Sequence, residues 1–257
     1  MSQRWDPQQY LKFAGPRLRP ALDLLGRVGV EDAASVYDLG CGPGNLAEFL
    51  KGRWPGAEIV GVDNSATMLE KARAAHPQEK WLEADLTHWR PERPADVIYA
   101  NAALQWVDGH ETLFPGLMAG LRDGGALAVQ MPRNHTAPSH ALMQDAIEAS
   151  PWAGVMRGAR GLPPVPGPEF YYDVLRPHAG ELDIWEAEYL QVLEGDNAVA
   201  EFTRGSALKV YLDALADDGQ RKAFFDDYSV RVQKAYPKRA DGKTLFPFRR
   251  LFIVATR

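Results

Sequence analysis

A glycine-rich turn that directly follows a short apolar run is the feature of this sequence that most limits its fold. The segment Val36–Asn45 reads Val-Tyr-Asp-Leu-Gly-Cys-Gly-Pro-Gly-Asn, and Leu46, Phe49 and Leu50 then fall on one face of a helical pattern. This order predicts a strand, a tight turn and a helix, the opening unit of a nucleotide-binding α/β domain. Glycines let the backbone turn sharply and approach a ligand closely, and the N-terminus of the following helix offers unpaired N–H groups.

The spacing of the glycines indicates which kind of nucleotide the turn accepts. Gly40, Gly42 and Gly44 are followed by Asn45, whereas the dinucleotide fingerprint G-x-G-x-x-G/A requires glycine or alanine at that position. Asp38 stands at the end of the predicted strand, where its carboxylate would repel a pyrophosphate. The pattern therefore favours a ligand that is cationic or carries an amino acid.

Two further acids follow at the ends of the next two predicted strands. Asp63 ends the run 58–63, about twenty residues after the turn, and a carboxylate there can accept hydrogen bonds from both hydroxyls of a ribose. The alternative is that Asp63 caps the following helix; we expect Ser65 to be the cap. Asp85 ends the run 81–86. Three acids at three consecutive strand ends favour a binding site.

Strands and helices alternate through the first half of the chain, which predicts a parallel sheet. We expect loops at 90–94 and 122–125, where charged residues accompany proline or glycine. Later in the chain, the pattern predicts two further strands after a long helical excursion. The predicted strands are 35–38, 58–62, 80–83, 95–100, 125–131, 182–193 and 245–256, and the predicted helices are 5–13, 17–28, 44–53, 66–75, 110–121, 139–149, a piece opening at 170–175, and a block at 196–236.

A segment rich in proline and glycine interrupts the alternation at 132–180. Its place directly after the fifth predicted strand is typical of a cap over an active site. We expect one domain over 1–257, with cap or insert segments at about 132–180 and 194–243.

Composition limits the class of protein and of partner. A chain of 257 residues with 46% hydrophobic and 25% charged residues suits one large α/β domain. The net charge of −5 argues against a nucleic-acid partner. Cys41 is the only cysteine, which excludes an intrachain disulfide. No apolar leader or membrane-length apolar run is present, so we expect a cytoplasmic protein without a membrane partner. The oligomeric state is left open.

The Asp-x-Gly-x-Gly-x-Gly turn resembles motif I of the class I methyltransferases that use S-adenosylmethionine. The resemblance implies a Rossmann-like, seven-stranded, mostly parallel sheet with helices on both faces and a helical cap, whose last two strands pair antiparallel. It implies that Asp85 accepts from the adenine amino group and that residues after the fourth strand line the site. The expected cofactor-binding residues are Asp38, Gly40, Cys41, Gly42, Gly44, Asn45, Asp63, Asn64, Met68, Asp85, Leu86, Asn101, Gln105 and Trp106.

Five segments together resemble the trans-aconitate 2-methyltransferase family: 5–13, 38–45, 101–106, 128–134 and 248–255. The resemblance implies methyl transfer from S-adenosylmethionine to a carboxylate of trans-aconitate, giving a monomethyl ester and S-adenosylhomocysteine. Because the carboxylate is already ionised at neutral pH, we expect neither an essential general base nor a metal. Candidates for substrate binding are Arg133, Tyr171, Tyr172, Trp5, Tyr10 and Arg250.

Three alternatives remain open at this point. One is a methyltransferase of the same fold that acts on another small-molecule oxygen or nitrogen, with His135 as the base. The others are an NAD-dependent dehydrogenase, which the missing third glycine opposes, and a non-catalytic binding module. We interpret His110, His135 and His140 as surface or cap residues, Trp106 as a site or core residue, and the two tyrosines as facing the substrate or packing.

Overall fold

The computed structural model describes residues 18–159, 161 and 163–257. The helix predicted at 5–13, with Trp5 and Tyr10, lies outside these residues. Contacts divide the chain into two compact units. Unit 1 comprises the described residues up to 132 with 165–187 and 250–257, and unit 2 comprises those within 133–164 and 188–249.

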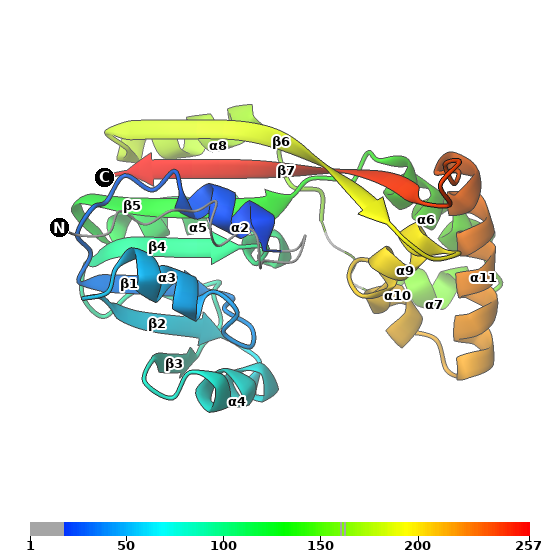
Figure 1. Cartoon of the computed structure of the whole chain (residues 1–257), viewed down its shortest axis with the longest axis horizontal. Coiled ribbons are helices and arrows are strands. Elements are labelled where there is room, and N and C mark those ends of the chain that lie inside the picture. The colour runs from blue at the N-terminus through cyan, green and yellow to red at the C-terminus, as the bar shows by residue number, and fades with distance from the viewer. Residues whose placement is uncertain (1–17, 160, 162) are drawn as a thin grey trace. The chain divides into compact units, whose positions relative to one another are not determined.

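A seven-stranded sheet with the order β3-β2-β1-β4-β5-β7-β6 confirms the predicted α/β architecture (Figure 1). β1 to β5 are parallel to one another, and β7 runs antiparallel to β5. The carboxyl ends of the parallel strands therefore share one edge of the sheet. The strands are β1 (Ser35–Leu39), β2 (Glu58–Asp63), β3 (Lys80–Glu83), β4 (Ala95–Asn101), β5 (Leu121–Pro132), β6 (Glu181–Leu193) and β7 (Thr244–Thr256); β6 and β7 contribute residues to both units.

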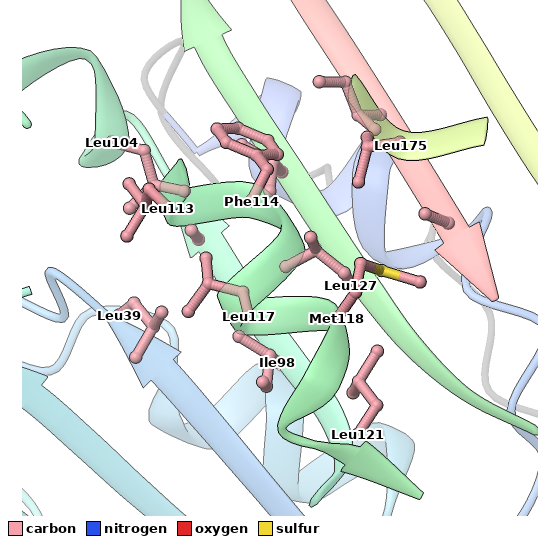
Figure 2. Close-up of a cluster of buried hydrophobic side chains, with 14 of the residues drawn as sticks. Leu39, Ile98, Leu104, Leu113, Phe114, Leu117, Met118, Leu121, Leu127 and Leu175 are labelled. Atoms are coloured by element: carbon pink, nitrogen blue, oxygen red, sulfur yellow. The ribbon is translucent and has the colours of Figure 1, made fainter. Parts of the chain in front are cut away.

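Helices cover both faces of the sheet in unit 1, so its central strands are buried on both sides, as parallel strands usually are. On β4, Ile98 packs in the core beneath α5 (His110–Ala119), where Figure 2 shows Leu117 lying next to it. The next residue, Tyr99, points to the opposite face and donates its hydroxyl hydrogen to Ala21 of α2. The helices of this unit are α2 (Arg19–Leu25), α3 (Ala47–Arg53), α4 (Ala66–Ala75), α5 (His110–Ala119) and α8 (Pro168–Leu175), with 3₁₀ turns η1 (Leu104–Trp106) and η2 (Arg176–His178).

Unit 2 is built around helices with an apolar core of its own. Met143, Phe224, Tyr228 and Phe246 belong to this core, and Asp217 caps the longest helix by accepting from the backbone N–H of Gln220. Its helices are α6 (Pro138–Ala149), α7 (Ala153–Arg157), α9 (Ala198–Arg204), α10 (Lys209–Asp213) and α11 (Asp218–Ala235). Across the part of the chain that the structure describes, no helix combines the length and apolar character needed to cross a membrane.

The prediction of a loop at 122–125 is wrong, because these residues belong to β5. Leu121 pairs with Ala95, and the register then shifts so that Val97 faces Ala126. Gly124 does adopt a turn-like φ of 74°, but the chain remains in the sheet because its N–H donates to Arg257, the C-terminal residue. A β-bulge thus accommodates turn-forming residues within a strand.

A buried carboxylate joins the starts of β1 and β4. Asp96 accepts hydrogen bonds from the backbone N–H groups of Ala34 (3.0 Å) and Ser35 (2.8 Å), from the Ser35 hydroxyl (3.0 Å) and from Arg122 Nε. Burial alone would raise the pKa of this carboxyl, but the bonds from Arg122 and Ser35 outweigh burial and lower it. The ionised carboxylate therefore stabilises the fold.

We predict that Asp96→Asn lowers the free energy of unfolding by about 1–3 kcal/mol at pH 7, because the amide NH₂ faces donors. Since the folded-state pKa is depressed, this stabilisation is present above the ordinary value of 3.8 and is lost as pH falls through the folded pKa. Urea unfolding at pH 7 and pH 3 tests this, with Asp123→Asn, an exposed acid near Arg257, as control. Equal losses in both variants would contradict the assignment.

Candidate functional site

The glycine turn after β1 adopts backbone angles that only glycine reaches easily. Gly40, Gly42 and Gly44 have φ of 68°, 54° and 83°. A Cβ on Gly40 would lie 2.3 Å from that of Ala103, and one on Gly44 would lie 2.7 Å from the Trp81 ring. Apart from its chain neighbours, no atom of the described residues lies within 4 Å of a Cβ built on Gly42. Gly40 and Gly44 are therefore required by packing, whereas Gly42 borders open space that a ligand can fill.

Asp63, the last residue of β2, holds the turn in place. Its Oδ2 accepts from the backbone N–H of Gly42 at 2.9 Å and its Oδ1 from that of Ser65 at 2.9 Å. Ser65 itself accepts from Met68 N–H as the cap of α4, as predicted. A carboxylate has about four acceptor positions, so each Asp63 oxygen retains capacity for a further donor such as a ribose hydroxyl.

Asp38 on β1 is buried close to Asp63. Burial, and then the negative charge of Asp63, raise the pKa of the Asp38 carboxyl to about 7. Burial together with Asp38 and Asp63 also raises the pKa of the Cys41 thiol, which therefore stays protonated and is no nucleophile. Like charges in a poorly solvated place favour occupation by a cation.

The third acid lies just beyond the adjacent strand β3. The Asp85 side chain is exposed, and its Oδ1 accepts from the backbone N–H of Thr87 at 2.8 Å. The bonds from Thr87 lower the pKa of this carboxyl. Because β3, β2 and β1 are neighbours, Asp85, Asp63 and Asp38 occur along one edge of the sheet. Of the other predicted cofactor residues near these strands, Asn45, Asn64 and Met68 are exposed and Leu86 is half-buried.

The end of β4 carries polar groups whose hydrogen bonds are incomplete. Gln105 is buried and donates from Nε2 to the carbonyl of Ala102 at 2.7 Å. Its Oε1 and the Oδ1 of Asn101 are buried without a partner among the described residues. Trp106 is 46% exposed, which excludes the alternative that it is a core residue. Ala102 has φ of 53°, unusual for a non-glycine residue and typical of strained functional sites.

Two buried polar side chains meet beyond this point, on β5 and β7. Arg250, a predicted substrate residue, is 6% exposed and donates from Nη1 to Gln130 Oε1 at 3.2 Å. Gln130 is not among the site residues predicted from the sequence. The sequence feature that could have indicated it is a single amide side chain within the otherwise apolar run 126–131.

Tyr171 packs in the core of unit 1, which corresponds to the packing alternative rather than to substrate contact. It is fully buried on α8, and its hydroxyl lies 2.7 Å from His110 Nδ1. Nε2 of His110 lies 2.9 Å from the Leu104 carbonyl, so His110 is a buried core residue and its prediction as a surface or cap residue is wrong. Tyr172 is 53% exposed.

Arg133, a candidate for substrate binding, and the histidines His135 and His140 belong to unit 2. Arg133 donates its backbone N–H to Arg249 at 3.0 Å and its side chain is half-buried. Burial and then the charge of Arg133 lower the pKa of His135, and burial and then His135 lower that of His140 to about 4. Both imidazoles are therefore neutral at pH 7.

Comparison with known proteins agrees with the geometry of this edge. A family profile described as a methyltransferase domain matches residues 36–125, which include the glycine turn and Asp63. The chain resembles solved methyltransferases at low identity. One is a methyltransferase from Bacillus halodurans (13% identity, TM-score 0.56, 91% of this chain and 96% of that one). Another is a phosphoethanolamine N-methyltransferase of Haemonchus contortus in complex with S-adenosyl-L-methionine (14%, TM-score 0.55, 99% and 58%).

Similarity in sequence is much closer to one group of relatives. Identity is 52% to the trans-aconitate 2-methyltransferase of Azoarcus sp. (strain BH72) over 98% of this chain and 99% of that one. It is 45% to that of Rhodopseudomonas palustris (strain BisB5), over 98% and 99%, and 42% to that of Yersinia pestis (strain Pestoides F), over 98% of each. The chain therefore belongs to the trans-aconitate 2-methyltransferase family of class I methyltransferases.

Proposed function

We propose that this protein transfers a methyl group from S-adenosylmethionine to a carboxylate of trans-aconitate, giving the monomethyl ester and S-adenosylhomocysteine. The observation that carries the proposal is the row of three acids beside the glycine turn: Asp38 on β1, Asp63 at the end of β2 and Asp85 two residues beyond β3, the three strands being neighbours. The names of relatives at 42–52% identity over nearly the whole chain support the substrate.

The residues of the edge fit S-adenosylmethionine, which supplies a methyl group bonded to a positively charged sulfur. The open space at Gly42 allows close approach of a ligand, and Asp63 retains acceptor capacity for ribose hydroxyls. The exposed carboxylate of Asp85 is placed to accept from the adenine amino group, while Asp38 and Asp63 favour positive charge. With them, Gly40, Cys41 and Gly44 form the turn, and the other expected contacts are Asn45, Asn64, Met68, Leu86, Asn101, Gln105 and Trp106.

The reaction mainly requires that the carboxylate and the methyl donor are held in the right relative position. A carboxylic acid with a pKa of roughly 4 reaches the enzyme ionised at neutral pH, so no side chain has to remove a proton from it. Holding the carboxylate and the methyl donor in line can contribute several kcal/mol to catalysis. We therefore assign no general base. Arginine suits a tricarboxylate because its planar guanidinium pairs with carboxylates, and Arg250 and Arg133 remain the candidates, with Tyr172 as a further exposed one.

The partner of this reaction is a small molecule. The net charge of −5 supports this and gives no basis for binding nucleic acid. A cytoplasmic location stays a prediction.

A methyl-transfer assay tests the proposal. Purified protein is mixed with S-adenosylmethionine and one acceptor from a panel of trans-aconitate, cis-aconitate, isocitrate, phenols and amines. We expect a monomethyl ester and S-adenosylhomocysteine with trans-aconitate, and little turnover with phenols or amines, because they need a base. Turnover only on a phenol or an amine would overturn the substrate assignment and leave the donor assignment intact.

We predict that Asp85→Asn raises the dissociation constant of S-adenosylmethionine about 10-fold, because the new NH₂ group faces the adenine amino donor while Oδ1 still accepts from Thr87. The Michaelis constant for trans-aconitate should change less than 2-fold. Equilibrium binding and initial rates measure the two effects. Glu83→Gln, at an acid that is also exposed and ends β3, is the control. Equal weakening in both variants would remove Asp85 from the site.

A further inference from the structure

Gln130 is a buried amide that neither the fold nor the proposed donor site explains. It is 0% exposed on β5, between the apolar residues Val129 and Met131. An amide in such a place costs free energy unless both its oxygen and its nitrogen have partners. Nε2 of Gln130 is buried and has no partner among the described residues.

The orientation of this amide is fixed by Arg250. The guanidinium of arginine carries only donors, so the Gln130 atom at 3.2 Å from Nη1 is the oxygen Oε1. Arg250 lies opposite Pro132 in the β5–β7 register, two residues from Gln130 and on the same face of the sheet. Nε2 is therefore a donor turned away from the guanidinium, and an acceptor from outside the described chain has to satisfy it.

The neighbouring strand places further incomplete polar groups at the same edge. Asn101 is the register partner of Gln130, and the residue after it, Ala102, donates its N–H to the Gln130 carbonyl at 2.8 Å. Asn101 Oδ1 and Gln105 Oε1 are buried without partners in the described structure. Strain at Ala102 adjoins them. Buried groups with open hydrogen-bonding capacity beside a strained residue are typical of a binding site.

We propose that Gln130 is a specificity-determining residue for the acid substrate: Nε2 donates to a carboxylate oxygen while Oε1 holds the guanidinium of Arg250. The carboxylate concerned is one that does not receive the methyl group. A neutral hydrogen-bond donor next to a cation binds a carboxylate well. It binds an uncharged ester or amide more weakly. This inference rests on the proposed function and adds to it the group that recognises a second carboxylate.

Gln130→Glu is the decisive variant because it is nearly isosteric. It keeps an oxygen for Arg250 but replaces the donor with a carboxylate oxygen, which repels the substrate. We expect the Michaelis constant for trans-aconitate to rise about 30-fold or more, with the dissociation constant of S-adenosylmethionine changed less than 3-fold. Gln191→Glu, at a buried glutamine on β6, controls for the general cost of a buried acid.

Dicarboxylate analogues, each lacking one carboxyl group of trans-aconitate, identify the carboxylate that is recognised. With the analogue that lacks it, wild type and Gln130→Glu should have kcat/KM within 2-fold of each other, a pattern that a purely structural role of Gln130 would not produce. An equal loss of kcat/KM on every analogue would overturn the inference.

Two failures are distinguishable. Wild-type protein that makes no ester from trans-aconitate would refute the proposed function. An active wild type and an unchanged Michaelis constant in Gln130→Glu would refute only the role of Gln130. If thermal unfolding shows that the glutamate variant does not fold, Gln130→Met decides. It lacks the donor without adding charge, so we expect about a 10-fold rise, and an unchanged value would overturn the inference.

Discussion

The parallel pairing of β1 with β2 places the buried carboxyl of Asp38 close to that of Asp63 beside the glycine turn, and this pair of acids constrains what the edge of the sheet can bind. Burial and the nearby negative charge raise the pKa of Asp38 to about 7. The folded protein therefore holds this proton more tightly than the unfolded chain. The associated stabilisation is fully present below the ordinary value of 3.8 and is lost as pH rises through about 7. At pH 7 about half of the Asp38 carboxyls of the free protein are ionised, and we expect a cationic ligand to favour the ionised form.

The same edge of the sheet has a second, complementary half. The strand ends at Asp38 and Asp63 are acidic, whereas on β5 and β7 the guanidinium of Arg250 donates to Gln130 Oε1 and the Nε2 donor of Gln130 has no partner among the described residues. Under the proposed function, we expect the positively charged methyl donor and the negatively charged acid to have separate partners along this edge. Such a division suits a reaction in which both reactants arrive charged and alignment is the main requirement.

Much of this site follows from the sequence because its signals are local. The glycine turn, Asp38 and Asp63 each occupy a fixed place relative to a strand end, and periodicity locates the strands. Contacts between distant segments were not predictable. His110 is buried because Tyr171, far away in the chain, meets its ring, and the residues near Gly124 stay in β5 because they bond to the C-terminal strand. The unpartnered Nε2 of Gln130 could not be predicted either, because the orientation of this amide depends on its hydrogen bond with Arg250 on another strand.

Calorimetry of S-adenosylmethionine binding at pH 7, in two buffers with different enthalpies of ionisation, tests the central claim most directly. If the cation lowers the raised pKa of Asp38, wild type should release about half a proton on binding. Asp38→Asn should release none, and S-adenosylhomocysteine, which lacks the sulfonium charge, should release fewer. An absence of proton release in wild type, or the same release from Asp38→Asn, would contradict the account.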